Sequence, residues 1–212
     1  MSKELRQRVF VPAYHVAPQS RFPQPIHDVY VAYRHLLSRG FRSCDITLVG
    51  ASAGGNIALA VLQILDTQRE PMVDRCVLIA PCVDLTLTSP SWRRNEHKCM
   101  LQFRPLQDSL SLTRVYYGPA EMEEIQEMAE HPLMSPIRGA LSDLPPVLVL
   151  VGSHDVLVEE SKELVRKIQN AGGTADYVEY PGKNHYTLLR GKTQMDQLYS
   201  QIRAFHLTSK KH

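Results

Sequence analysis

A serine, an aspartate and a histidine, far apart along the chain, are the residue types that nucleophilic catalysis uses. Ser52 is the central residue of a G-x-S-x-G pattern, and Asp155 and His185 follow it in that order. A serine hydroxyl is a poor nucleophile at neutral pH, so an imidazole must accept its proton and a carboxylate must orient that imidazole. The three residues therefore predict acyl transfer. In this scheme Ser52 attacks the carbonyl, His185 acts as base and then as acid, and Asp155 orients His185.

Each of the three residues follows an apolar or alternating run that is typical of a β-strand. Because ligands of open α/β sheets bind at the carboxyl ends of the strands, the three side chains are expected to meet there. Strands alternate with amphipathic helices along the sequence, which predicts an α/β fold with a mainly parallel sheet. The predicted strands are 46–49, 75–80, 147–151 and 176–180, and the predicted helices are 26–37, 56–68, 158–170 and 193–206.

The context of Ser52, a strand followed by a sharp turn and a helix, is that of a nucleophile elbow. Side chains in place of Gly50 and Gly54 are expected to collide with the neighbouring strand and helix. The backbone amide of Ala53 is expected to point toward a developing oxyanion, and the positive end of the following helix favours negative charge there.

Each member of the predicted triad also has a simpler interpretation. Ser52 could lie in a glycine-rich turn that merely packs closely, Asp155 could cap the helix that begins at Val158, and His185 could be a solvated loop residue. Their occurrence together, each after a predicted strand and in the order Ser, Asp, His, favours the catalytic interpretation.

Length and composition fit a single domain over residues 1–212 with a substantial core. The 24 basic and 22 acidic residues give a net charge of +2, so charge gives no reason to expect nucleic acid as a partner. No apolar run approaches the roughly 20 residues that span a bilayer, and the N-terminal residues do not resemble a signal peptide. We therefore expect a cytoplasmic protein without a transmembrane segment.

Neither a metal nor a cofactor is expected. The four cysteines include no C-x-x-C pair, and Cys76 opens an apolar run typical of a buried strand. The chain has no H-E-x-x-H motif and no P-loop, and the glycines around Ser52 do not form G-x-G-x-x-G.

Two segments lie outside the strand–helix alternation. Residues 85–131 predict two or three short helices without a strand, which we interpret as a cap above the sheet; ordinary core helices are the alternative. The cap's apolar residues include Trp92, Met100, Phe103 and Leu106, which indicates an apolar pocket.

Near the start of the chain, residues 3–8 predict a helix and residues 8–12 a short strand.

Several motifs resemble the hormone-sensitive-lipase branch of the α/β-hydrolases, which includes carboxylesterases and arylacetamide-deacetylase-like enzymes. Residues 50–56 are similar to that family's G-D-S-A-G-G-N elbow, residues 131–136 to its H-P-L-x-S-P, and residues 152–157 to its acid loop. Residues 14–23 with Asp28 resemble its Y-R-L-A-P-E…F-P…D stretch, and His185 matches its catalytic histidine. The resemblance implies an α/β-hydrolase fold and ester hydrolysis by Ser52, Asp155 and His185, with Tyr14 and Asp28 as structural residues.

The resemblance also places the family's H-G-G-G oxyanion loop and the first strands of its sheet upstream of Met1. We therefore expect the chain to correspond to the C-terminal two-thirds of such an enzyme. Two hypotheses follow: a carboxylesterase acting on small apolar esters, or a catalytically impaired remnant or ligand-binding protein on the same scaffold. The sequence leaves acyl and alcohol specificity and the oligomeric state open.

Overall fold

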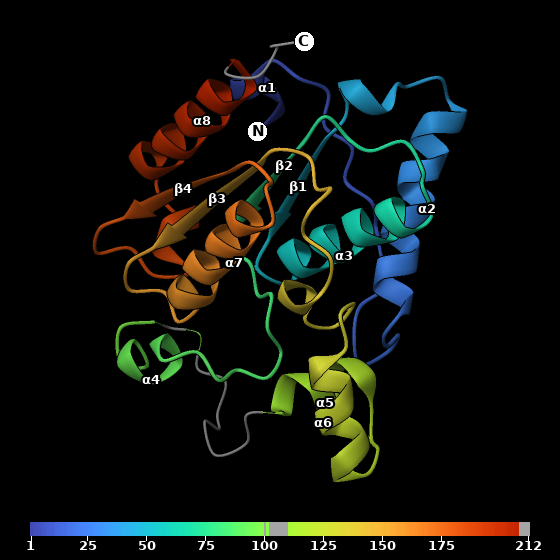
Figure 1. Ribbon diagram of the computed structural model, residues 1–212. Helices are drawn as coiled ribbons and strands as arrows, with labels where there is room; N and C mark the ends of the chain where they lie inside the picture. The colour runs from blue at the N-terminus through green and yellow to red at the C-terminus, as the bar shows by residue number, and fades with distance from the viewer. Residues whose placement is uncertain (100, 102–109, 208–212) are drawn as a thin grey trace.

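The core of the protein is a parallel four-stranded sheet, with the strands in their order along the chain. The computed structural model describes residues 1–99, 101 and 110–207 (Figure 1). The strands are β1 (Thr47–Ala51), β2 (Arg75–Ile79), β3 (Val147–Gly152) and β4 (Ala175–Tyr180). All three strand pairings are parallel. The α/β fold with a parallel sheet, predicted from the alternating pattern, is thereby confirmed.

The two central strands are buried on both faces. Every residue of β2 and β3 is buried, as their continuous apolar runs predict. Cys76 in β2 is fully buried, and burial raises the pKa of its thiol to about 12, so it behaves as a small apolar core residue.

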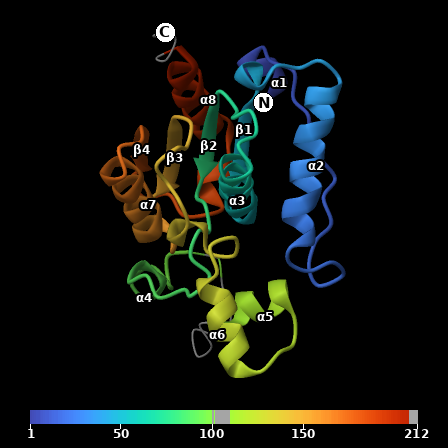
Figure 2. The same cartoon turned by 45° about the vertical axis from the view of Figure 1, so that its right-hand side comes forward.

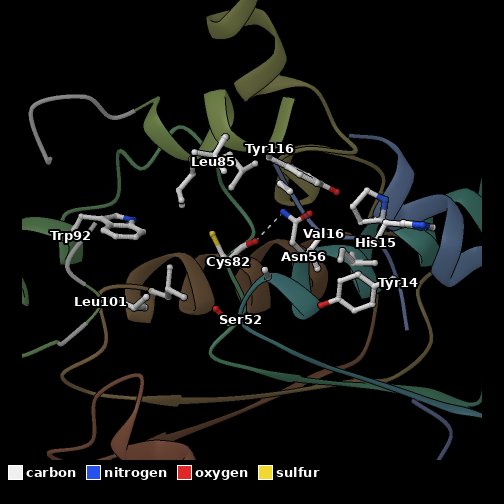
Figure 3. A pocket seen from close by; sticks show the side chains of 17 residues that line it. Tyr14, His15, Val16, Ser52, Asn56, Cys82, Leu85, Trp92, Leu101 and Tyr116 are labelled. Carbon is white, nitrogen blue, oxygen red and sulfur yellow. Dashed lines mark hydrogen bonds between the residues drawn. The ribbon is translucent and has the colours of Figure 1, made fainter. Parts of the chain in front are cut away.

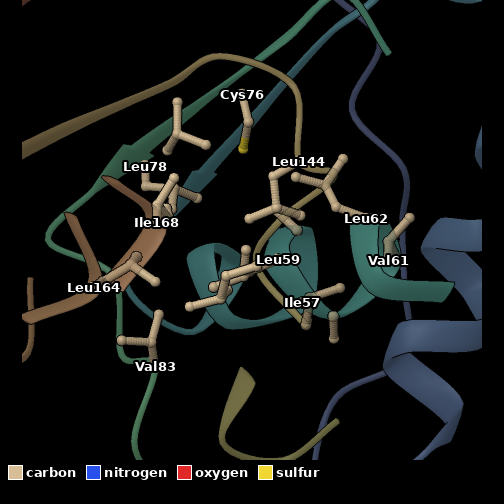
Figure 4. Packing of buried hydrophobic residues seen from close by; sticks show 14 of the residues in the cluster. Ile57, Leu59, Val61, Leu62, Cys76, Leu78, Val83, Leu144, Leu164 and Ile168 are labelled. Carbon is tan, nitrogen blue, oxygen red and sulfur yellow. The ribbon is translucent and has the colours of Figure 1, made fainter. Parts of the chain in front are cut away.

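Helices cover both faces of the sheet. On one face, α3 (Ala53–Thr67) and α7 (Val158–Asn170) pack on the sheet, for example Leu164 of α7 near Leu78 of β2 (Figure 4). The helix α2 (Gln24–Ser38) packs on α3. On the other face, α8 (Lys192–Leu207) packs on Val77 and Leu150 through Leu198 and Ile202. The alternation of side chains along β2 and β3 thus supplies two separate apolar layers.

The remaining helices are short. They are α1 (Ser2–Leu5), α4 (Ser91–Arg94), α5 (Ser111–Tyr117) and α6 (Met122–Glu130), with 3₁₀ turns at Ser43–Asp45, Pro136–Arg138 and Thr187–Leu189. In both views, α5 and α6 lie at the opposite end of the molecule from α1 (Figures 1 and 2). In the described part of residues 85–131, the helices α4, α5 and α6 agree with the prediction of two or three short helices. Met100, Phe103 and Leu106 from that prediction lie outside the described residues, as does the predicted tail of Lys210, Lys211 and His212.

The strand predicted for residues 8–12 is wrong. This segment has no regular secondary structure, and Val9, Phe10 and Val11 are exposed to 43%, 54% and 79%. β-Branched and aromatic residues favour a strand only where a neighbouring strand accepts their hydrogen bonds, and none of the four described strands pairs with this segment. The helix predicted for residues 3–8 forms but ends at Leu5, where Arg6 adopts a left-handed conformation.

Candidate active site

The structure brings Ser52 and Asp155 within hydrogen-bonding distance of the two ring nitrogens of His185. His185 Nε2 lies 2.9 Å from Ser52 Oγ, and His185 Nδ1 lies 2.9 Å from Asp155 Oδ2. Ser52 follows β1, Asp155 follows β3 and His185 follows β4, so all three lie at the carboxyl edge of the sheet. The arrangement has the geometry in which an imidazole can take a proton from a hydroxyl while a carboxylate orients it.

Ser52 is held on a sharp turn between β1 and α3. Its φ of 54° and ψ of −122° are unusual for a residue with a side chain. Two hydrogen bonds fix this conformation: Ser52 N donates to the carbonyl of Ile79 at 2.9 Å, and Cys82 N donates to the carbonyl of Ser52 at 3.2 Å. The neighbouring strand β2 and the loop after it therefore stabilise the strained serine.

The glycines around Ser52 have different roles from one another. A Cβ atom at Gly50 would lie 2.3 Å from the carbonyl oxygen of Gly54, as predicted. The predicted collision at Gly54 is wrong, because a Cβ there has no neighbour within 4 Å. The close contact is instead at Gly55, whose Cβ would lie 2.6 Å from Cβ of Pro81, because Gly55 faces the loop after β2 while Gly54 faces open space.

The amide of Ala53 begins helix α3 directly after Ser52. As the first residue of a helix, Ala53 has an N–H group without an intrahelical acceptor. That donor, together with the positive end of the helix dipole, favours negative charge beside Ser52.

Asp155 contacts both His185 and the turn that leads into α7, so the two interpretations of its sequence position do not exclude each other. Its side chain is fully buried, and while Oδ2 contacts His185, Oδ1 accepts a hydrogen bond from the backbone N–H of Leu157 at 3.0 Å. The carboxylate thus holds the turn that leads into α7 and orients the imidazole at the same time.

His185 is not a solvated loop residue, since only 7% of it is exposed. The preceding residue, Asn184, accepts hydrogen bonds from the backbone N–H groups of Tyr186 and Thr187 at 3.2 and 3.0 Å. The ring of Tyr186 stands edge-on to the imidazole, with the ring centres 5.9 Å apart. These contacts limit the orientations open to His185.

A cavity of about 240 Å³ opens beside Ser52 (Figure 3). Trp92 and Leu101 lie on one side of Ser52 in this view, and Tyr14 and Val16 lie on the other. Within the described part of the chain, no Asp, Glu, Lys or Arg side chain lines the cavity. The site therefore favours uncharged, largely apolar groups, as the composition of residues 85–131 indicates.

The loop segment at residues 14–18 contributes to this cavity, although the sequence analysis assigns Tyr14 only a structural role. Tyr14 and His15 both line the cavity. Asp28 fits the structural role, because its carboxylate accepts hydrogen bonds from His15 N at 2.8 Å and from Gln24 Nε2 at 2.7 Å. The pattern of residues 14–23 therefore includes both a support and a cavity wall.

Three buried polar side chains near the site have no predicted role: Asn56, which is noted only as part of the elbow motif, Glu160 and Asn95. Asn56 Nδ2 donates to the carbonyls of Cys82 and Met134 at 2.9 and 2.8 Å, which ties α3 to the loop after β2. Glu160 accepts a hydrogen bond from Val83 N at 2.7 Å, and Asn95 binds the acid loop. No local pattern marks Glu160 or Asn95, since their partners lie 58 to 77 residues away.

A metal centre is not indicated in the residues that the structure describes, where no group of three or more His, Cys, Asp or Glu side chains could hold an ion. Among the same residues, no helix is long and apolar enough to cross a membrane.

Comparison with known proteins identifies the family. A family model described as the alpha/beta hydrolase fold matches residues 1–189. The chain belongs to the α/β-hydrolase family. Crystal structures agree: one esterase superposes with a TM-score of 0.85 at 23% identity, covering 96% of this chain and 61% of that one. An esterase of the bacterial hormone-sensitive lipase family superposes with a TM-score of 0.74 at 26% identity, covering 95% and 67%, which agrees with the branch that the motifs indicate.

Curated relatives of this α/β-hydrolase include an esterase of Acinetobacter venetianus and an acetyl-hydrolase of Streptomyces hygroscopicus. The first is 34% identical over 170 residues, which cover 80% of this chain and 53% of the relative. The second is 34% identical over 172 residues, which cover 81% and 54%. The chain therefore spans about half the length of the curated relatives that it matches.

Proposed function

We propose that this α/β-hydrolase hydrolyses carboxylic esters of small, uncharged, largely apolar substrates through an acyl-enzyme on Ser52. The observation that carries the proposal is the pair of 2.9 Å contacts that join Ser52 Oγ to His185 Nε2 and His185 Nδ1 to Asp155 Oδ2. The names of the relatives, an esterase and an acetyl-hydrolase, support the same reaction class.

In the first half of the reaction, Ser52 Oγ forms a bond to the ester carbonyl carbon while its proton passes to His185 Nε2. The carbonyl oxygen becomes an oxyanion, which the amide of Ala53 and the first turn of α3 stabilise. When the carbon–oxygen bond to the alcohol breaks, His185 returns the proton to the leaving alkoxide. The acyl group then remains on Ser52.

In the second half, His185 removes a proton from a water molecule that attacks the acyl carbon. The tetrahedral intermediate collapses, the bond to Ser52 Oγ breaks, and the serine regains its proton from His185. A carboxylic acid leaves, so the sum of the two halves is ester plus water giving acid plus alcohol. Asp155 stabilises the imidazolium that forms in each half.

The cavity supports the substrate class. At about 240 Å³ it is smaller than the roughly 300–1,000 Å³ of typical drug-sized sites, which favours short acyl and alcohol groups. We further propose that residues 85–131 act as a cap within a single domain of residues 1–212, since Leu85, Trp92 and Leu112 from this segment line the cavity.

Turnover of p-nitrophenyl acetate and butyrate, combined with labelling by a fluorophosphonate, tests the proposal. The wild type is expected to hydrolyse both esters and to be labelled, and Ser52→Ala is expected to do neither. Ser38→Ala is the matched control, because Ser38 lies at the end of α2 and its hydroxyl donates to the nearby carbonyl of His35 at 2.8 Å. Labelling or turnover that persists in Ser52→Ala would remove Ser52 from its role, and absence of turnover in the wild type would favour a ligand-binding protein on this scaffold.

A further inference from the structure

The segment of residues 91–98, which contains α4, contacts the loop that carries Asp155. Asn95 Nδ2 donates hydrogen bonds to the carbonyl of Ser153 at 3.1 Å and to the carbonyl of Asp155 at 2.8 Å. Ser91 Oγ donates to the carbonyl of Val156 in the same loop. In both views α4 lies beyond the first turn of α7 (Figures 1 and 2), so this segment covers the acid loop from outside the sheet.

The backbone and the carboxylate of Asp155 are therefore held by different partners. Asn95 fixes the carbonyl of Asp155, while Leu157 N and His185 Nδ1 bind the two carboxylate oxygens at 3.0 and 2.9 Å. Asn95 is 1% exposed, so its hydrogen bonds to these carbonyls are shielded from bulk solvent. A shift of the Asp155 backbone would move the carboxylate away from the imidazole.

The same segment also reaches the loop that carries His185. Asn184 Nδ2 donates to the carbonyl of Lys98 at 2.8 Å, and Asn184 directly precedes His185. Lys98 N in turn donates to the carbonyl of Asn95 at 2.9 Å. Residues 95–98 thus connect the acid loop to the histidine loop, with Asn95 at one end and Lys98 at the other.

We propose that Asn95 is a positioning residue that sets the carboxylate of Asp155 against the imidazole of His185. The inference rests on the proposed ester hydrolysis and adds to it a residue that acts through Asp155. Without the Asn95 amide, the carbonyls of Ser153 and Asp155 lose a buried donor, and the loop shifts to satisfy them. A displacement of about 1 Å in such a site can lower the rate about 10²-fold.

Gln63 supplies a matched control for a merely structural role. Its buried amide Nε2 also donates to a backbone carbonyl, that of Pro136, at 2.7 Å, yet it contacts neither the acid loop nor the histidine loop. Replacing Gln63 by alanine removes a bond of the same chemistry far from the reacting atoms.

The test compares the wild type, Asn95→Ala and Gln63→Ala by steady-state hydrolysis of p-nitrophenyl acetate and by proton NMR. For Asn95→Ala we expect kcat to fall about 10²-fold with KM little changed, because substrate contacts remain while alignment is lost. We also expect the downfield NMR signal of the His185 Nδ1 proton, hydrogen-bonded to Asp155, to weaken or move. Gln63→Ala is expected to keep both kcat and that signal.

The inference is overturned if Asn95→Ala keeps kcat and the downfield signal, or if Gln63→Ala loses as much of both. Should the alanine variant not fold, Asn95→Leu retains the side-chain volume and removes the donor, and the same two outcomes apply. If the wild type hydrolyses no ester, the proposed function fails, whereas the NMR comparison still decides whether Asn95 positions Asp155.

Discussion

The carboxyl edge of the sheet and residues 91–98 both contact the candidate active site, but through different kinds of structure. At the sheet edge, Ser52, Asp155 and His185 follow strands whose regular hydrogen bonds fix the backbone. Residues 91–98 have no strand and one helix of four residues. They contact the acid loop through the buried amide of Asn95 and the histidine loop through the exposed carbonyl of Lys98. We therefore propose that the sheet supplies the reacting groups and that residues 91–98 align them, while Trp92 of the same segment lines the cavity.

The largest expected effect is at the sheet edge, on the carboxylate. Asp155→Asn keeps the shape of the side chain but removes the charge that orients and stabilises the imidazolium, so kcat is expected to fall by about 10⁴-fold. Steady-state kinetics with p-nitrophenyl acetate measure this. Asp28→Asn, in helix α2 and outside the residues that line the cavity, is the control and is expected to keep kcat. Equal losses of kcat in the two variants would contradict the distinction between the regions.

The elbow distinguishes two glycines that the sequence analysis treats alike. Gly50→Ala is expected to lower the free energy of unfolding by about 3 kcal/mol or more, because its Cβ would lie 2.3 Å from a backbone oxygen that cannot move aside. Gly54→Ala, where nothing lies within 4 Å, is expected to be neutral or slightly stabilising in the first turn of α3. Urea denaturation of both variants checks this, and an equal loss of stability would show that the elbow is packed differently.

Glu160 of α7, which accepts a hydrogen bond from Val83 N, makes the free energy of unfolding depend on pH. Burial, opposed by the hydrogen bond from Val83 N and assisted by the charge of Asp84, raises the pKa of Glu160 to about 8 from an unfolded value of 4.5. With this raised pKa, the folded protein keeps the carboxyl group protonated to a higher pH than the unfolded chain does. The stability that the group contributes is therefore complete below pH 4.5 and is lost as the pH rises to about 8.

Glu160→Gln carries no titrating group, so the variant is expected to gain stability relative to the wild type as the pH rises from 4.5 to 8. Denaturation midpoints of both proteins across that range measure the difference. A difference that stays constant with pH would show that Glu160 is ionised in the folded state already.

The smallest expected effect concerns the part of the cavity wall that α5 contributes. Leu112→Ala enlarges the cavity beside Ser52, so the ratio of kcat/KM for butyrate over acetate esters is expected to rise by roughly 10-fold, the value of a methylene group or two in an apolar pocket. Leu189→Ala, at an exposed position outside the cavity, is the control. An unchanged ratio in Leu112→Ala would mean that the acyl chain does not contact α5.

Local patterns predicted the sheet and the meeting of Ser52, Asp155 and His185 at its carboxyl edge, because the signals are short-range; the catalytic roles of the three residues stay predictions. An apolar or alternating run followed by a loop residue is enough to place Asp155 and His185 at one edge of a parallel sheet. The same reasoning failed for residues 8–12, where β-forming side chains have no described partner strand. It also failed at Gly54, because which glycine of the elbow is in tight contact depends on Pro81, 27 residues further along the chain.

The roles of Asn95, Glu160 and Tyr14 could not be predicted either, because their contacts are with residues far away in the sequence. Asn95 and Glu160 are recognisable only once the carbonyls of the acid loop and the amide of Val83 lie against them. The cavity lining by Tyr14 likewise depends on how its loop folds beside α3. From sequence alone, polar residues such as Asn95 and Glu160 are expected on the surface, and only the fold shows that they are buried.

Trapping of the acyl-enzyme shows whether Ser52 carries the acyl group during ester hydrolysis. The protein is mixed with p-nitrophenyl acetate, quenched with acid within the first turnovers, and the acetylated peptide is identified by mass spectrometry. We expect an acetyl group on Ser52 that accumulates only when His185 is intact. Steady ester hydrolysis without acetylation of Ser52, or with the acetyl group on another residue, would contradict it.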